Sequence, residues 1–165
     1  MFNTIEITEL ETLLKSKFSD SVLAVEQHYD ISVATIKLND IKEAIRFFYD
    51  LGFTFLTTCN AMHFPHQTEK FAMVYHLHDL PRNLRIRLKA FTSAEVPTFP
   101  SLTELFPAAN WMEREAYDFF GIKFTGHPDL RRILNMDDMV GFPLRKEFPL
   151  EDQARWDKDD KMFGR

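Results

Sequence analysis

Cysteine is almost absent from this 165-residue chain, and its scarcity excludes two kinds of site. The single cysteine, Cys59, has no second thiol with which to form an intramolecular disulfide. A 4Fe–4S cluster needs about four thiolate ligands. This chain therefore cannot hold such a cluster by itself.

Long apolar runs are also missing. The sequence contains no stretch of about 18 or more uncharged apolar residues, the length that crosses a bilayer. The N-terminus, MFNTIEITELETLLK, lacks the basic start and apolar centre of an export signal. We therefore expect an intracellular protein with no direct membrane span.

Basic residues are outnumbered by acidic residues. The balance of 20 Lys and Arg against 25 Asp and Glu gives a formal charge of −5, which is the wrong sign for a chain that binds by neutralising phosphates. With five glycines and no GxGxxG motif, the sequence does not predict a nicotinamide or flavin loop. We expect no nucleic-acid partner, and we interpret one basic segment as a solvated strand face. Its residues are Arg82, Arg85, Arg87 and Lys89.

What the sequence does contain is a helix and strand pattern of one α+β domain. Thr8 and Glu11 have capping-box spacing at the start of a first helix, and a second helix is expected over residues 40–51, with Asn39 as its cap and Gly52 as its stop. The β-branched runs VLAVEQ and ISVATIKL lie between these helices and predict a hairpin.

Three further segments predict strands: FTFLTTCN, KFAMVYHLH and LRIRLKAF. In the last of them Leu84, Ile86 and Leu88 alternate with basic residues, so only one face suits burial. The expected fold class is α+β, with a mixed or antiparallel sheet that has one wet face and packed helices.

A third helix is expected at EREAYDFF. Prolines within residues 97–107 exclude long regular elements before it. Asn110 is its expected N-cap, Glu113 completes something like a capping box, and Gly121 ends the helix.

The sequence changes character after this helix. Residues 1–125 form the expected α+β body, which ends with the EREAYDFFG helix. Residues 126–165 have few periodic apolar positions and predict an extended, proline-containing tail. A tail this polar needs another surface, so we expect it to lie on a partner subunit.

Charged residues surround the third helix at Glu113, Arg114, Glu115 and Asp118. An acid/base pair would need a cleft and a substrate, but no nucleophile or phosphate loop is nearby. A solvated helix with intrahelical ion pairs, each contributing a few tenths of a kcal/mol, is the simpler alternative. We favour an ion-pair network with downstream cations or with a neighbouring protein's acids. The downstream cations are Arg131, Arg132, Arg145 and Lys146.

Four histidines are the candidate metal ligands: His63, His66, His76 and His78. Three or four such nitrogens would suffice for zinc. However, neither a cysteine pair nor an HExxH helix accompanies them, so we interpret them as surface or core residues. A free-standing histidine-based metal protein is the alternative of another class.

The run EREAYDFFGIKFTGHPDLRRIL (residues 113–134), followed by GFPLRKEFPL (residues 141–150), closely resembles the signature of the 30 kDa subunit of proton-pumping NADH:quinone oxidoreductase, respiratory complex I. Met139 departs from the pattern, because the family often has tryptophan there, so we expect a local packing contact to differ at this position. The matching positions are Glu113, Arg114, Glu115, Asp118, Phe119, Phe120, His127, Arg131, Ile133 and Leu134.

The resemblance implies a cofactor-free structural and assembly subunit of the peripheral arm. Such a protein contributes to electron transfer from NADH to quinone, coupled to proton translocation, without catalytic residues of its own. The resemblance also implies FMN and iron–sulfur clusters in partner subunits, and a peripheral position on the cytoplasmic side of the inner (cell) membrane. The equivalent subunit of a related membrane-bound hydrogenase or ferredoxin-dependent dehydrogenase is the alternative within this class, and a plain adaptor is the simplest one.

The resemblance further implies contacts with other peripheral-arm subunits, among them the quinone-site subunit. We expect the charged and aromatic residues of the motif to form the anchor at that contact. They are Glu113, Arg114, Glu115, Asp118, Phe119, Phe120, His127, Arg131, Arg132, Arg145 and Lys146.

Overall fold

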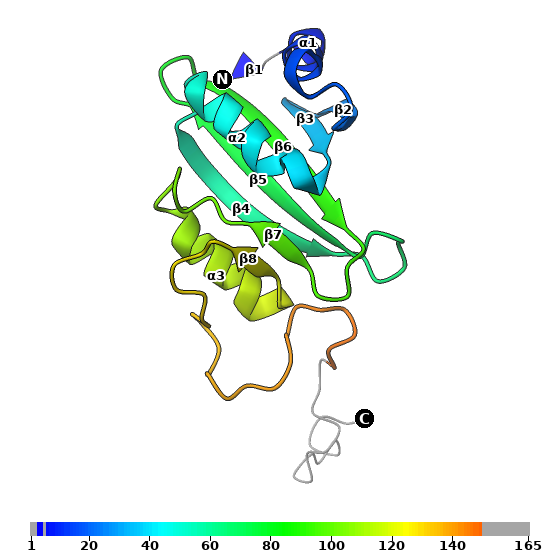
Figure 1. The fold of residues 1–165 in the computed structure, drawn as a ribbon, viewed down its shortest axis with the longest axis vertical. Coiled ribbons are helices and arrows are strands. Elements are labelled where there is room, and N and C mark those ends of the chain that lie inside the picture. Colours follow the sequence, from blue (N-terminus) through cyan, green and yellow to red (C-terminus); the bar gives the residue numbers. More distant parts are fainter. Residues whose placement is uncertain (1–2, 5, 150–165) are drawn as a thin grey trace, which may run out of the picture.

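A six-stranded mixed sheet organises the computed structural model, which describes residues 3–4 and 6–149 (Figure 1). A second, two-stranded sheet and three α-helices complete the described fold. The helices are α1 (Ile7–Phe18), α2 (Ile41–Asp50) and α3 (Ala109–Phe120), with a 3-10 turn, η1 (Leu38–Asp40), before α2. The strands are β1 (Asn3–Thr4), β2 (Val22–His28), β3 (Ile31–Ile36), β4 (Phe55–His63), β5 (Phe71–Asp79), β6 (Leu84–Thr92), β7 (Thr98–Pro100) and β8 (Lys123–Thr125).

The large sheet has the order β2-β3-β6-β5-β4, with β1 beside the start of β6. The pairs β2–β3, β4–β5 and β5–β6 are antiparallel, whereas β3–β6 and β1–β6 are parallel. The predicted α+β class and mixed sheet are therefore confirmed. Hydrophobic alternation shows which face of a strand is buried, but not which strand lies beside it, so the parallel pairs could not be read from the sequence.

The core lies between the sheet and its helices. Ile41, Ile45 and Phe48 of α2 are fully buried in one cluster with Tyr75 and Leu77 of β5. Burying such a side chain contributes about 1.5–3 kcal/mol. The periodic apolar positions of α2 were thus predicted correctly, because their spacing places them on one face of the helix.

The expectation of one wet sheet face is wrong for β5. Every residue of this strand is buried except His76, which is half-buried. β5 lies inside the sheet between β4 and β6, where Arg87 of β6 lies opposite His76. On the face that carries His76, side chains of α3 line a common cavity with β5.

The predicted helix caps are also wrong, although the helices themselves are present. Thr8 and Asn110 lie inside the first turns of α1 and α3, and Asn39 lies in the 3-10 turn before α2. A local cap signal defines the start of a helix only to within one or two residues, and each predicted cap lies within two residues of the observed one. The residues in the cap positions are Glu6, Asp40 and Ala108, and none of them makes a side-chain cap hydrogen bond.

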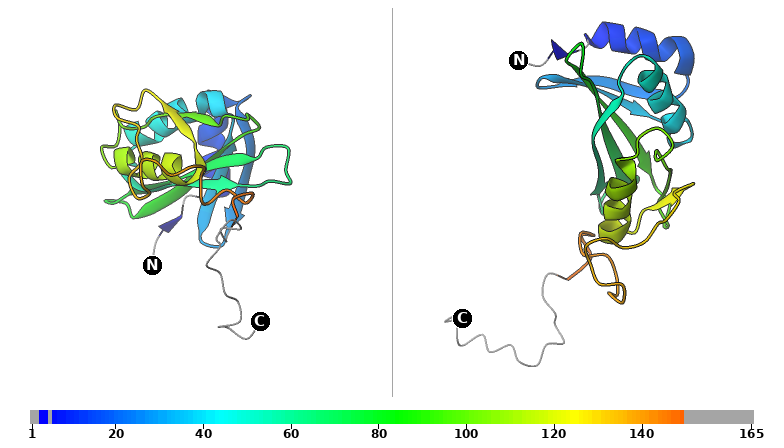
Figure 2. Two further views of the ribbon diagram at one scale, coloured as in Figure 1. Left: turned by 90° about the horizontal axis from the view of Figure 1, so that it is seen from below. Right: turned by 90° about the vertical axis from the view of Figure 1, so that its left-hand side faces the viewer.

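The small β7–β8 sheet and α3 lie at the opposite end of the molecule from α1 (Figure 2). Residues 126–149 follow β8 without further helix or strand and run beside α3. They make the described part of the predicted tail, whereas residues 150–165 lie outside the described residues. No helix in the described part of the chain is long and apolar enough to cross a membrane.

Candidate functional site

The charged helix α3 and residues 126–148 fold together into one unit, which we call the α3 clasp. α3 ends at Gly121, whose φ of 72° is left-handed and whose N–H donates to the Tyr117 carbonyl over 2.8 Å. Glycine adopts this conformation without the strain that a β-carbon adds. The turn directs the chain into β8 and then back along the helix.

Phe142 closes the clasp over this glycine. Its ring lies 6.4 Å from the Tyr117 ring, measured between centroids. A β-carbon built on Gly121 would lie only 2.4 Å from a ring atom of Phe142. The guanidinium groups of Arg132 and Arg145 lie 5.5 and 4.8 Å from the Phe142 ring centroid, within cation–π range.

We expect Gly121→Ala to lower the free energy of unfolding by about 2 kcal/mol, because the left-handed backbone and the contact with Phe142 both oppose a methyl group. Gly126→Ala is the matched control, since Gly126 also has positive φ (85°) but nothing within 4 Å of its built β-carbon. Chemical denaturation of the two purified variants measures the difference. Equal losses would show that the Phe142 contact contributes nothing.

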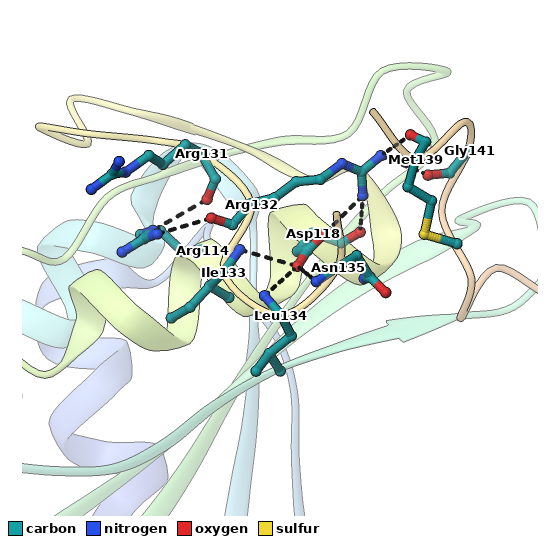
Figure 3. Close-up of polar contacts among 9 residues, drawn as sticks. All are labelled: Arg114, Asp118, Arg131, Arg132, Ile133, Leu134, Asn135, Met139 and Gly141. Atoms are coloured by element: carbon teal, nitrogen blue, oxygen red, sulfur yellow. Dashed lines mark hydrogen bonds and ion pairs between the residues drawn. The ribbon is translucent and has the colours of Figure 1, made fainter. Parts of the chain in front are cut away.

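Asp118 is the centre of the clasp (Figure 3). Its side chain is fully buried, and its Oδ2 accepts three backbone N–H groups, those of Ile133, Leu134 and Asn135, at 3.1, 2.8 and 2.9 Å. Burial alone would raise the pKa of Asp118, but these N–H groups and the Arg132 guanidinium hold it well below its ordinary value. The carboxylate therefore stays ionised and binds the backbone of a loop.

Arg132 supplies the countercharge. Its Nη1 lies 2.7 Å from Asp118 Oδ1 and also donates to the Asp118 carbonyl, and its Nη2 donates to the carbonyls of Met139 and Gly141 at 2.8 and 2.9 Å (Figure 3). One guanidinium thus joins α3 to two points of the following loop. This is the one ion pair of the predicted network that forms between α3 and the downstream cations in the described part of the chain.

The Arg114 side chain binds backbone carbonyl groups of the same loop. Its Nε and Nη2 donate to the carbonyls of Arg131 and Arg132 at 3.2 and 2.9 Å. The Arg131 side chain is 68% exposed and pairs with exposed Asp129, 2.9 Å away, instead of with α3. The predicted pairing of Arg131 with the helix carboxylates is therefore not what the structure has.

The last part of the clasp is fixed by Arg145 and Lys146. Arg145 Nε donates to the Phe120 carbonyl at 2.7 Å, and the Lys146 N–H donates to His63 Nδ1 at 3.0 Å. His127, nearer the start of the loop, lies with Nε2 3.2 Å from the Asn110 carbonyl. The structure thus places these predicted residues in the clasp. Their hydrogen bonds involve backbone groups, however, and none of these bonds is made to a carboxylate of α3.

Glu113 does not join the expected ion-pair network with the downstream cations, because its side chain bonds to the loop at Ser101 and Leu102. It is fully buried, and its two oxygens accept the Leu102 N–H and the Ser101 hydroxyl, each at 2.7 Å. Burial raises the pKa of Glu113 to about 7, although these two hydrogen bonds and Lys42 oppose the shift. Its predicted capping role is wrong, because the carboxyl group instead holds the loop after β7.

The remaining predicted residues, Glu115, Phe119 and Phe120, line an open cavity between α3 and the sheet. Cys59 and His76 both line this cavity, but burial raises the pKa of the Cys59 thiol well above its ordinary value, and the two ring nitrogens of His76 are bonded to Arg87 and Thr58. The pattern EREAYDFF indicated a functional helix, but Ser101 carried no sequence signal of its own. The proline-flanked GFP run at Phe142 was the one available sign of a fixed turn.

The histidines are held by other contacts. His76 Nε2 accepts from Arg87 Nε at 2.7 Å, so its Nδ1 carries the proton towards the Thr58 hydroxyl at 2.8 Å. The His63 ring stacks on Phe71, with ring centroids 4.6 Å apart. Within residues 3–4 and 6–149, no group of three or more His, Cys, Asp or Glu side chains is placed to hold a metal ion.

Comparisons with known proteins agree on one family. A family model described as "Respiratory-chain NADH dehydrogenase, 30 Kd subunit" matches residues 34–154. An NADH-quinone oxidoreductase subunit from Citrifermentans bemidjiense is 41% identical over 143 residues, which cover 86% of this chain and 89% of that protein. A solved trypsin-resistant fragment (1–134) of Nqo5 aligns with a TM-score of 0.66 at 30% identity, covering 73% of this chain and 98% of the fragment.

A second solved structure shares the fold. It is a chain of the membrane-bound sulfane sulfur reductase, an archaeal respiratory membrane complex, with a TM-score of 0.75 and 20% identity. The alignment covers 91% of this chain and 94% of the other. At this identity, the likeness concerns the fold alone.

Proposed function

Because this chain belongs to the family of the 30 kDa subunit of respiratory-chain NADH dehydrogenase, we propose that it is a structural subunit of the peripheral arm of an NADH-quinone oxidoreductase. In this role it contributes to electron transfer from NADH to quinone by holding other subunits in place. The complex is a proton-translocating enzyme, and this chain supplies no catalytic residue to it.

One observation carries the proposal: the clasp presents apolar side chains to solvent. Val140 is 90% exposed and Met136 73% exposed, and both lie in a loop that Asp118 and Arg132 hold in a defined shape. Apolar side chains that are exposed on a loop of fixed shape are typical of surfaces that a partner covers. The exposed apolar residues of the clasp are Trp111, Leu134, Met136, Val140 and Leu144.

The partner that we propose for this surface is the quinone-site subunit. The α3 clasp, including Glu115, Phe119, Phe120 and Arg131, would form the contact, and residues beyond 149 would continue over the neighbour. In this arrangement FMN belongs to another subunit, and so do the iron–sulfur clusters, which need several thiolate ligands where this chain offers one buried thiol, Cys59. The complex would hold the chain peripherally at the cytoplasmic side of the cell membrane.

We expect Val140→Asp to lower the amount of assembled complex about tenfold or more, because a charge would replace an apolar contact at the interface. The unfolding free energy of the free chain should change by less than about 0.5 kcal/mol, since the side chain is exposed. Co-purification of the other subunits with a tagged chain from detergent extracts measures assembly. Leu80→Asp, in the β5–β6 turn and 55% exposed, is the matched control. Equal assembly of both variants would contradict the proposed interface.

The equivalent subunit of a membrane-bound hydrogenase or ferredoxin-dependent dehydrogenase is the second candidate, supported by the shared fold of the sulfane sulfur reductase chain. The two candidate functions differ in the electron donor that the complex uses. A purified complex that reduces quinone with NADH supports the first candidate, whereas one that accepts electrons only from ferredoxin or hydrogen supports the second.

A further inference from the structure

A cavity of about 650 Å³ opens between α3 and the large sheet. One wall consists of apolar side chains from α3 and the clasp, including Phe119, Phe120 and Leu144. The other wall is the polar face of β5 and β6, with His76, Arg87 and Lys89. Leu144 lines the cavity and is also one of the exposed apolar residues of the clasp.

The cations of this cavity lack anionic partners among the described residues. Neither Arg87 nor Lys89 has a carboxylate within ion-pair distance there, whereas Arg85 on the same strand pairs with Asp30 at 3.0 Å. Glu115 is the one carboxylate among the described lining residues. On a chain with a formal charge of −5, cations therefore outnumber carboxylates in the described lining of this cavity by two to one.

His76 positions one of these cations. Its Nε2 accepts from Arg87 Nε, which fixes the stem of the guanidinium group and directs its remaining N–H groups away from that bond. Burial, followed by the charges of Arg87, Arg85 and Lys89, lowers the pKa of His76 to about 4. The same charges that keep this imidazole neutral would attract an anion into the cavity.

We propose that this cavity receives an extended, acidic segment of a neighbouring subunit, with a carboxylate against Arg87 and Lys89 and an adjacent apolar side chain against Phe119 and Leu144. Guanidinium groups bind carboxylates through paired hydrogen bonds, and the apolar wall supplies the area that such a contact needs. The inference rests on the proposed function, because it requires that the chain be assembled with other subunits.

A photo-crosslinking amino acid at Met62 tests the inference in the assembled complex. Met62 lines the cavity and is 41% exposed; Phe55, on the same strand and 46% exposed, lies outside the lining and is the control. We expect a crosslink from position 62, but not from position 55, to an acidic peptide of another subunit, identified by mass spectrometry. A crosslink to residues 150–165 of this chain, or none in an assembled complex, would overturn the inference.

Reversing the charge of a lining residue provides a second, independent test of the inference. Lys89→Glu should reduce the position-62 crosslink about tenfold or more, Lys89→Arg should retain it, and exposed Lys37→Glu should leave it unchanged. A full-strength crosslink with Lys89→Glu would also overturn the inference. If the chain does not co-purify with other subunits at all, the proposed function fails instead, so the two failures are distinguishable.

Discussion

Asp118→Ala is expected to lower the free energy of unfolding by about 3–5 kcal/mol, the range for removing one partner of a buried ion pair. The substitution would leave the Arg132 guanidinium, 12% exposed, without its carboxylate. It would also leave three backbone N–H groups of residues 133–135 without their acceptor. Denaturant unfolding of the purified chain, followed by circular dichroism, measures the loss.

Asp129→Ala is the matched control for this prediction. Asp129 pairs with Arg131, but both side chains are more than half exposed, so its loss should cost at most about 1 kcal/mol. Asp118→Asn should fall between the two, because the amide keeps one oxygen acceptor and the volume but loses the charge. An Asp118→Ala variant as stable as Asp129→Ala would show that the clasp contributes nothing to folding.

The same contacts connect stability to assembly. Residues 133–141 make no regular secondary structure, and Asp118 and Arg132 hold their backbone in one shape. A loop that is ordered before binding loses less conformational entropy when a partner docks. We therefore expect Asp118→Ala to lower co-purification of partner subunits even at a temperature where the chain remains folded.

Two carboxylates on one helix show how far sequence reasoning extends. Glu113 and Asp118 were both predicted to be anchors of the motif, and both are fully buried. Their environments differ because Asp118 meets Arg132 and three N–H groups, whereas Glu113 meets a hydroxyl and a single N–H group. These partners lie 11 to 17 residues away, at distances that no local pattern encodes.

The same holds for the fold: features that depend on neighbouring residues were predicted, whereas contacts between distant segments were not. The existence of α2, the stop at Gly121 and the β2–β3 hairpin follow from spacing and from glycine, so they were predicted. The parallel pairing of β3 with β6 joins Ser32 to Ile86, positions that are far apart in the sequence, so no local pattern predicts it. Arg132 was a predicted cation, but its carbonyl partners at Met139 and Gly141 became visible only in the folded chain.

The second large effect that we expect is a pH-dependent stability difference caused by Glu113. Its folded-state pKa of about 7 lies above the ordinary value of 4.5, because burial disfavours the ionised form. As pH rises above 4.5, ionisation of this group lowers the free energy of the unfolded chain, whereas the folded chain keeps the proton and is not stabilised in this way. The free energy of unfolding should therefore fall by about 1.4 kcal/mol per pH unit between pH 4.5 and 7, about 3 kcal/mol in total.

Glu113→Gln isolates this contribution. The amide can accept the Leu102 N–H and donate to the Ser101 hydroxyl, so it imitates the protonated acid. We expect the variant to lie within about 1 kcal/mol of the natural chain at pH 5 and to exceed its unfolding free energy by about 3 kcal/mol at pH 8. Denaturant unfolding across this pH range gives the difference curve.

The difference curve is needed because other buried groups act in the opposite direction. The pKa values of His63 and His76 are lowered from 6.5, first by burial, so their contribution to stability is lost as pH falls below that value. Both histidines are present in the natural chain and the variant, and their effects cancel. A Glu113→Gln variant that is equally destabilised at pH 5 and pH 8 would show that Glu113 is ionised in the folded chain and stabilises it as a carboxylate. The exposed Glu95→Gln exchange, which should change stability by less than about 0.5 kcal/mol, is the control for charge alone.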